Sequence, residues 1–244
     1  MRRPWLPVRW RLIAVIVVLL VRLARWRIVP QGLRHVPQHG GAVLAFNHHS
    51  YVDFIMLAWA PVRLLRREIR FLAKREIWES PRTRWAVRLV GAVPVDRAST
   101  SSRSHAYTAA IEALRQGDLV AVAPEQTISS SYELLPFRTG AARMAQQAGV
   151  PIIPVVGWGS HRFATKGVPP RLITKLAVSV RYGDPIEVGP DDDPREVTDR
   201  LRDQMTDMLH DVQESYPDGA PAGASWVPAR LGGGAPPPED DQSS

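Results

Sequence analysis

The segment NHHSYVD, residues 47–53, places an imidazole and a carboxylate five positions apart, at His48 and Asp53. A carboxylate held against one ring nitrogen of a histidine fixes its tautomer. It also stabilises the imidazolium that forms when the other nitrogen takes a proton. That is the chemistry of a general base, and we predict it for His48 with Asp53 as its orienting partner.

This chemistry requires a turn between two regular elements. Positions five apart point about 140° apart on a helix, so the two side chains cannot share one helical face. The apolar run 42–46 predicts a buried strand, and residues 54–59 predict the start of a helix. If His48 lies in the turn and Asp53 in the first helical turn, the carboxylate folds back onto the imidazole, with Ser50 capping the helix.

Other interpretations of the segment stay open. His48 and His49 are also compatible with ordinary turn residues, and Asp53 with a charge at a helix start. A metal-dependent membrane hydrolase would use His48, His49 and Asp53 as ligands, but adjacent histidines tend to point apart and no cysteine or HxxxH pair completes a coordination shell. A non-catalytic lipid-binding protein is a third possibility, and the His/Asp pair argues against it.

The rest of the chain alternates short apolar runs with helical patterns, which is typical of an α/β sheet with flanking helices. We predict strands at 42–46, 71–73, 92–95, 119–123, 152–156 and 176–181. We predict helices around 107–114, at 139–148 and at 194–214, the last with an apolar stripe and Asp193 as its cap.

The basic charge is concentrated at one end of the chain. The 244 residues carry a formal charge of +7 and no cysteine, which excludes disulfides and thiolate chemistry. Residues 1–52 hold eight arginines and no acidic residue, more than the whole excess. No nucleic-acid recognition element accompanies this patch, so we do not predict nucleic acid as a partner.

The N-terminal segment has the composition of a membrane anchor. An apolar run at 12–21 is bracketed by arginines, with tryptophans near its flanks. Ten helical residues span about 15 Å, half of a hydrocarbon core of about 30 Å, so we expect residues 1–29 to form a monotopic anchor helix. A signal peptide is the alternative, but arginines rather than small residues follow the run. Residues 217–244 are rich in proline, glycine and serine and are expected to be disordered.

Three further blocks end apolar runs with polar groups. Residues 91–95 precede Asp96 and Arg97, residues 119–123 precede Glu125 and Thr127, and a proline-rich block follows at 150–154. Together with NHHSYVD, their order and spacing resemble the glycerolipid acyltransferase family, which contains the 1-acylglycerol-3-phosphate acyltransferases. The resemblance covers roughly residues 30 to 185 and rests on four blocks in order.

The resemblance implies a role for each matched residue. His48 becomes the base and Asp53 its orienting carboxylate, while Arg97 binds the acceptor's phosphate. Glu125, Thr127 and Lys74 match further substrate-binding positions. Family members usually read Glu-Gly-Thr-Arg in the third block, whereas this chain has Gln126 and Ile128 at the glycine and arginine positions. Arg138 or Arg97 would then supply the missing charge, or the acceptor is another lysolipid or a glycolipid.

The resemblance also implies a fold and partners. The fold is α/β, with a mixed, largely parallel sheet flanked by helices as in glycerol-3-phosphate acyltransferases, and the acyltransferase domain spans residues 30–216. The reaction moves an acyl group from acyl-CoA or acyl carrier protein to a lipid hydroxyl, with no metal and no cofactor. We expect the protein at the cell membrane, monotopic or peripheral, with membrane lipids as partners and the active site facing the cytoplasm.

Overall fold

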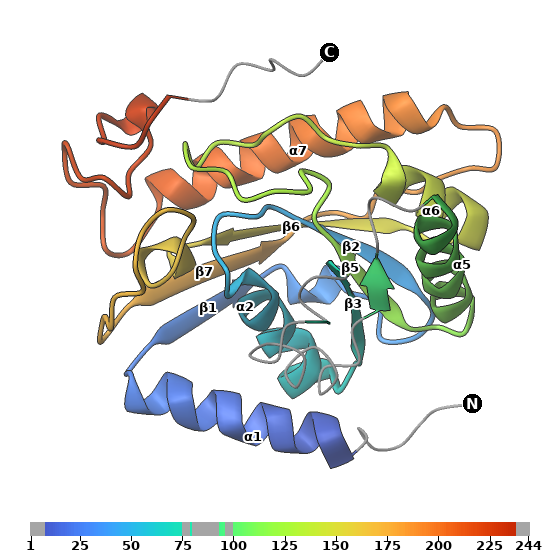
Figure 1. Ribbon diagram of the computed structural model, residues 1–244, viewed down its shortest axis with the longest axis horizontal. Coiled ribbons are helices and arrows are strands. Elements are labelled where there is room, and N and C mark those ends of the chain that lie inside the picture. The colour runs from blue at the N-terminus through green and yellow to red at the C-terminus, as the bar shows by residue number, and fades with distance from the viewer. Residues whose placement is uncertain (1–7, 75–78, 80–92, 96–99, 238–244) are drawn as a thin grey trace.

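The computed structural model describes residues 8–74, 79, 93–95 and 100–237. Within them, seven strands form one sheet with helices on both faces (Figure 1). The strands are β1 (Arg27–Gln31), β2 (Ala42–Phe46), β3 (Ile69–Lys74), β4 (Val93–Val95), β5 (Leu119–Val122), β6 (Ile152–Trp158) and β7 (Ala177–Tyr182). The helices are α1 (Val8–Leu23), α2 (Asp53–Ala60), α5 (Thr100–Arg115), α6 (Gly140–Ala148) and α7 (Pro194–Glu214). The predicted α/β class and the predicted strands are confirmed.

The sheet is mixed and mostly parallel, in the order β1-β7-β6-β2-β5-β3-β4. Among the described strands, only β6 and β7 pair antiparallel, because they are joined by a loop rather than by a crossover helix. The neighbouring strands β5, β2 and β6 run parallel, so their carboxyl ends meet at one edge. In open α/β sheets this edge is where ligands bind.

The central strand β2 shows why its sequence is apolar throughout. Val43 and Ala45 pack into a core shared with α5, α6 and α7, while Leu44 and Phe46 pack into a second core that includes α2. Because helices cover both faces of the sheet, each β2 side chain is buried whichever way it points. The strand is therefore a rigid support for the turn that follows it.

The N-terminal segment differs from its prediction at one boundary. Helix α1 ends at Leu23, and residues 27–29, which we assigned to the anchor helix, belong to β1. Strand β1 pairs only with β7, and an edge strand tolerates Pro30, which obscured the strand in the sequence. None of the helices in the described ranges has the length and apolar character needed to span a bilayer.

The predicted disorder of the tail is wrong for residues 217–237. Val227 is fully buried and Ala235 nearly so, and Arg230 contacts Glu133 and Glu214. The glycines form backbone hydrogen bonds within the segment, such as Gly223 N to Gly232 O at 2.8 Å. A composition averaged over the tail conceals these few anchoring side chains. Residues 238–244 lie outside the described part of the chain.

Candidate active site

The turn after β2 is held by a side chain that extends the sheet. Asn47 follows the last residue of β2, and its amide pairs with the backbone of Gly157 in β6. Gly157 N donates to Asn47 Oδ1 at 2.7 Å, and Asn47 Nδ2 donates to Gly157 O at 3.0 Å. This reciprocal pair continues the β2/β6 ladder by one step. The chain leaves the sheet from a fixed point, and the next residue is His48.

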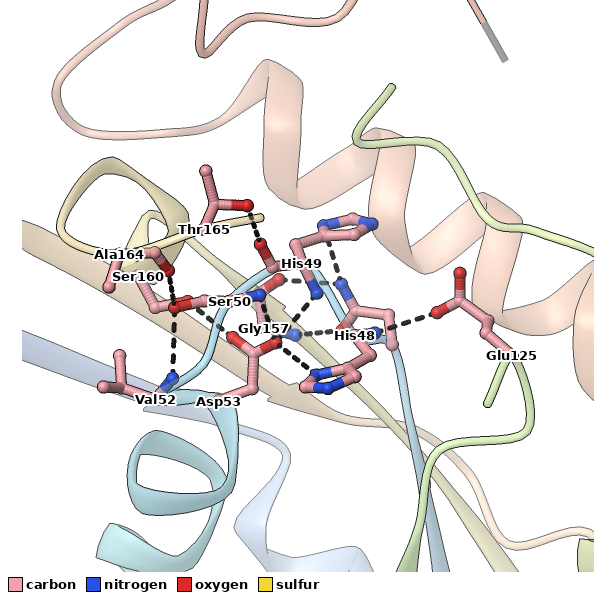
Figure 2. A network of polar contacts seen from close by, with 11 residues as sticks. His48, His49, Ser50, Val52, Asp53, Glu125, Gly157, Ser160, Ala164 and Thr165 are labelled. Carbon is pink, nitrogen blue, oxygen red and sulfur yellow. Dashed lines mark hydrogen bonds and ion pairs between the residues drawn. The ribbon is translucent and has the colours of Figure 1, made fainter. Parts of the chain in front are cut away.

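His48 and Asp53 form the predicted pair (Figure 2). His48 Nδ1 lies 3.2 Å from Asp53 Oδ2, across the turn that joins β2 to α2. Asp53 is the first residue of α2 and is 5% exposed, whereas the His48 side chain keeps 26% of its surface exposed. The imidazole is therefore accessible and the carboxylate is not. This is the arrangement in which a buried acid orients an imidazole and stabilises its charged form.

Asp53 is fixed by three further donors. The backbone amides of His49 and Ser50 donate to Oδ2 at 2.8 and 2.7 Å. The hydroxyl of Ser160 donates to Oδ1 at 2.6 Å. Hydrogen bonds to a carboxylate favour its charged form and its position. The predicted Ser50 cap contacts the residue just before the helix: Ser50 Oγ accepts from the backbone N–H of Val52 at 3.2 Å and donates to Ala164 O at 2.6 Å. Val52 is the cap residue of α2, and its side chain makes no cap hydrogen bond.

Glu125 supports His48 from the neighbouring strand. It follows β5, is 6% exposed, and accepts from the backbone N–H of His48 at 2.8 Å and of Leu135 at 2.9 Å. Burial raises the pKa of Glu125 to about 8, while these two hydrogen bonds oppose the rise. Both oxygens face backbone amides, so the structure gives Glu125 a positioning contact; its predicted substrate contact stays a prediction.

The structure describes three of the four remaining predicted substrate-binding residues. Thr127 and Arg138 are exposed, and Arg138 N donates to Pro124 O at 3.0 Å, which holds Arg138 next to the Glu125 block. Lys74 ends β3, and Arg97 lies outside the described residues. Ile128, at the family's arginine position, is 8% exposed.

Gln126 occupies the position where the family has glycine, and it has φ 61°. This is the left-handed region, which side chains adopt at a cost and glycine adopts freely. The turn thus keeps a backbone conformation suited to glycine although the residue has changed.

His49 is separated from His48 by burial. Its ring is fully buried among the rings of Tyr132, Trp158 and His161. Its Nδ1 lies 3.0 Å from Asn47 Nδ2, and Figure 2 shows the two histidine rings pointing apart. Burial lowers the pKa of His49 to about 4 and that of His161 to about 3. Within the ranges that the structure describes, no three histidine, aspartate or glutamate side chains are grouped as metal ligands.

Ser160 is the site residue that the sequence did not reveal. It lies 107 positions from Asp53 and is 1% exposed. The sequence could have indicated it through the length of the preceding strand, because β6 runs to Trp158 rather than to the predicted Val156. Extending the strand by two residues places Ser160 just beyond a strand end, where the other site residues were found.

The chain matches a family model and several curated proteins. A family model described as Acyltransferase matches residues 27–158. The 1-acyl-sn-glycerol-3-phosphate acyltransferase alpha of Homo sapiens is 30% identical over 76% of this chain and 65% of its own length. The corresponding Bacillus subtilis protein is 30% identical over 51% of this chain and 59% of its own. The chloroplast protein of Brassica napus is 30% identical over 56% of this chain and 39% of its own.

A solved structure shares the fold. The crystal structure of PlsC, the 1-acyl-sn-glycerophosphate (LPA) acyltransferase of Thermotoga maritima, superimposes with a TM-score of 0.69 and 24% identity. The match covers 85% of this chain and 80% of that one. The chain spans about two fifths to two thirds of the length of the three relatives named above.

Proposed function

The chain belongs to the Acyltransferase family, and on this premise we propose that it transfers a fatty acyl group from a thioester to a lipid hydroxyl. The donor is acyl-CoA or acyl carrier protein. The names of the relatives favour 1-acyl-sn-glycerol 3-phosphate as acceptor, which gives phosphatidic acid. The observation that carries the proposal is the contact of His48 Nδ1 with the buried carboxylate of Asp53.

The proposed reaction is a direct transfer. A carboxylate accepts hydrogen bonds only, so His48 carries a proton on Nδ1 and presents Nε2 as the base. Nε2 removes the proton of the acceptor hydroxyl while its oxygen attacks the thioester carbonyl. The new C–O bond forms, the C–S bond breaks, and the imidazolium returns the proton to the leaving thiolate. Asp53 stabilises the imidazolium between these two transfers.

Recognition of the acceptor phosphate falls to residues around the same edge. The third block has Ile128 at the family's arginine position, so it offers no guanidinium there, and the Ile128 side chain is buried. Arg138 is exposed and tethered to Pro124 at the start of that block, and we assign it to the phosphate. Arg97, Thr127 and Lys74 remain the other proposed binding residues.

The proposed location is the cytoplasmic surface of the cell membrane, with the protein monotopic or peripheral. Helix α1 exposes a row of apolar side chains, and its flanking arginines complement anionic lipid. An enzyme held there meets an acceptor that is itself a membrane lipid.

Incubation of the purified protein with labelled acyl-CoA or acyl carrier protein and a panel of lysolipids and glycolipids tests the proposal. We expect label in phosphatidic acid when 1-acyl-sn-glycerol 3-phosphate is present, with Arg138→Gln raising its KM more than that of an uncharged lysolipid. Product from another acceptor alone would change the acceptor and keep the reaction class. Acyl release to water that a chelator abolishes would indicate the metal-dependent hydrolase, and no turnover with any acceptor would indicate the binding protein.

A further inference from the structure

The loop between β6 and β7 contacts residues 47–52, the turn between β2 and α2 that carries His48. We call these residues the catalytic turn. Ala164 O accepts from Ser50 Oγ at 2.6 Å and from Tyr51 N at 3.3 Å. Thr165 Oγ1 donates to His49 O at 2.7 Å. Residues 163–175, here called the bridging loop, are therefore connected to the residues on both sides of the turn's centre. A displacement of the bridging loop would act directly on the turn that carries His48.

The far end of the bridging loop touches the end of α1. Lys175 N donates to Ala24 O at 2.9 Å, and Trp26 Nε1 donates to Ile173 O at 2.6 Å. The Trp26 ring also packs edge-on against Phe163, with centroids 5.1 Å apart. The bridging loop thus connects the exit of α1 to the catalytic turn by contacts at each end.

The exposed apolar surface of the protein is concentrated around these elements. Nine of the eleven large apolar side chains found exposed in the described residues lie on α1 or on the bridging loop. The other two are Tyr51, in the catalytic turn, and Leu64, in the π-helical turn Pro61–Leu65 that contacts α1. On the bridging loop, Leu172 is 84% exposed. Exposed apolar groups gathered in one region mark a surface that something covers.

The charge of the bridging loop indicates what covers it. Lys166, Arg171 and Lys175 are exposed, and residues 163–183 contain no acidic residue. At the adjoining end of α1, Arg22 and Arg25 are exposed as well. Apolar side chains flanked by exposed cations fit the boundary of an anionic bilayer, where the apolar groups enter the acyl region and the cations meet lipid phosphates.

We propose that the bridging loop is a second membrane-contact element, which inserts Leu172 into an anionic bilayer beside α1. With both ends tied down, the inserted loop holds the catalytic turn, which carries the exposed Tyr51, at the lipid surface. The contact is with the bilayer rather than with a protein. It does not depend on acyl transfer, since the bridging loop has this surface whatever reaction His48 performs.

The absence of cysteine in the chain permits a direct test with single labels. A nitroxide or an environment-sensitive fluorophore is attached to Leu172→Cys in the full-length protein. The matched control is Arg195→Cys, an exposed position on α7, which lies on the other side of the sheet from α1 (Figure 1). On addition of vesicles of phosphatidylglycerol and phosphatidylcholine, the label at 172 should become shielded from aqueous quenchers, and the label at 195 should stay accessible. A label at 172 that stays in water on vesicle-bound protein overturns the proposal.

Partition measurements give a second test, which separates the bridging loop from α1. We expect Leu172→Asp and Arg171→Glu each to weaken binding to the anionic vesicles about 5- to 50-fold, while Arg195→Glu, with the same charge change as Arg171→Glu, leaves it within about 2-fold. Unchanged partition of both loop variants would show that α1 alone binds and would contradict the proposal. Oligomers that form through residue 172 without lipid, seen by light scattering, would replace the bilayer with a second copy of the chain. These readouts need no turnover, so failure of the proposed function leaves them interpretable.

Discussion

Two adjacent histidines of one turn lie in opposite environments. His48 is partly exposed and faces a buried carboxylate that accepts from two backbone amides and a serine hydroxyl. His49 is completely buried in an aromatic cluster with His161, where burial lowers the pKa of both rings. The first environment can stabilise a positive charge on the imidazole during proton transfer. The second environment disfavours a positive charge on either buried ring. Residue type therefore does not decide which histidine can act as a base; exposure and the nearest carboxylate do.

The comparison predicts that the two histidines fail in different ways when removed. We expect His48→Ala to lower kcat by about 10²- to 10⁴-fold, because positioned base catalysis is worth that much, while the unfolding free energy changes by less than about 1 kcal/mol. His49→Ala should instead destabilise the fold by about 2–5 kcal/mol through the cavity it leaves. Transfer assays and urea denaturation on the same preparations measure both. Full turnover by His48→Ala, at matched protein concentration, would remove the base assignment.

Removal of the Asp53 carboxylate should give the next largest effect on kcat. Asp53→Asn keeps the size of the side chain but replaces one acceptor oxygen with an NH₂ group and removes the negative charge. The amide cannot stabilise an imidazolium at His48, and it cannot accept all the hydrogen bonds that the carboxylate accepts. We expect kcat to fall about 10²- to 10³-fold while the far-UV circular dichroism stays native. Asp118→Asn is a control, since it also removes a carboxylate paired with a basic residue, Arg70, but away from the turn. Near-normal turnover of Asp53→Asn would show that proximity to His48 has no catalytic consequence.

The sequence predicted one part of this comparison and missed the other for a physical reason. The strand at 42–46, the turn and the His48/Asp53 pair are local, so periodicity and spacing within a dozen residues reveal them. Ser160 reaches Asp53 from 107 positions away, and Trp226 O accepts a hydrogen bond from His161 across 65 positions. Such contacts are decided by how β6 and the tail pack, which no local pattern encodes. The same limit explains why the tail was predicted to be disordered.

Ser160 offers a finer test of how the carboxylate is held. Loss of its charge-assisted hydrogen bond in Ser160→Ala should lower kcat about 10-fold with little change in KM, and Ser160→Thr should restore most of the rate. Thr198→Val is the control, because it removes a buried hydroxyl that donates only to Pro194 O in α7. A lower melting temperature with an unchanged kcat in Ser160→Ala would reduce Ser160 to a structural residue.

The two buried histidines, His49 and His161, should make the unfolding free energy depend on pH. With folded pKa values of about 4 for His49 and about 3 for His161, below the unfolded value near 6.5, the unfolded chain takes up protons that the folded protein refuses. The associated stability is present above about pH 6.5 and is lost progressively as the pH falls toward 4. His161→Phe removes one of these groups, so the slope of unfolding free energy between pH 6 and 4.5 should fall by about 1.4 kcal/mol per pH unit. Urea denaturation across this window measures it, with His39→Phe as the exposed control. Equal slopes for His161→Phe and the parent would show that His161 takes up its proton as readily in the folded protein as in the unfolded chain. The claim that the aromatic cluster disfavours a charged histidine would then be wrong.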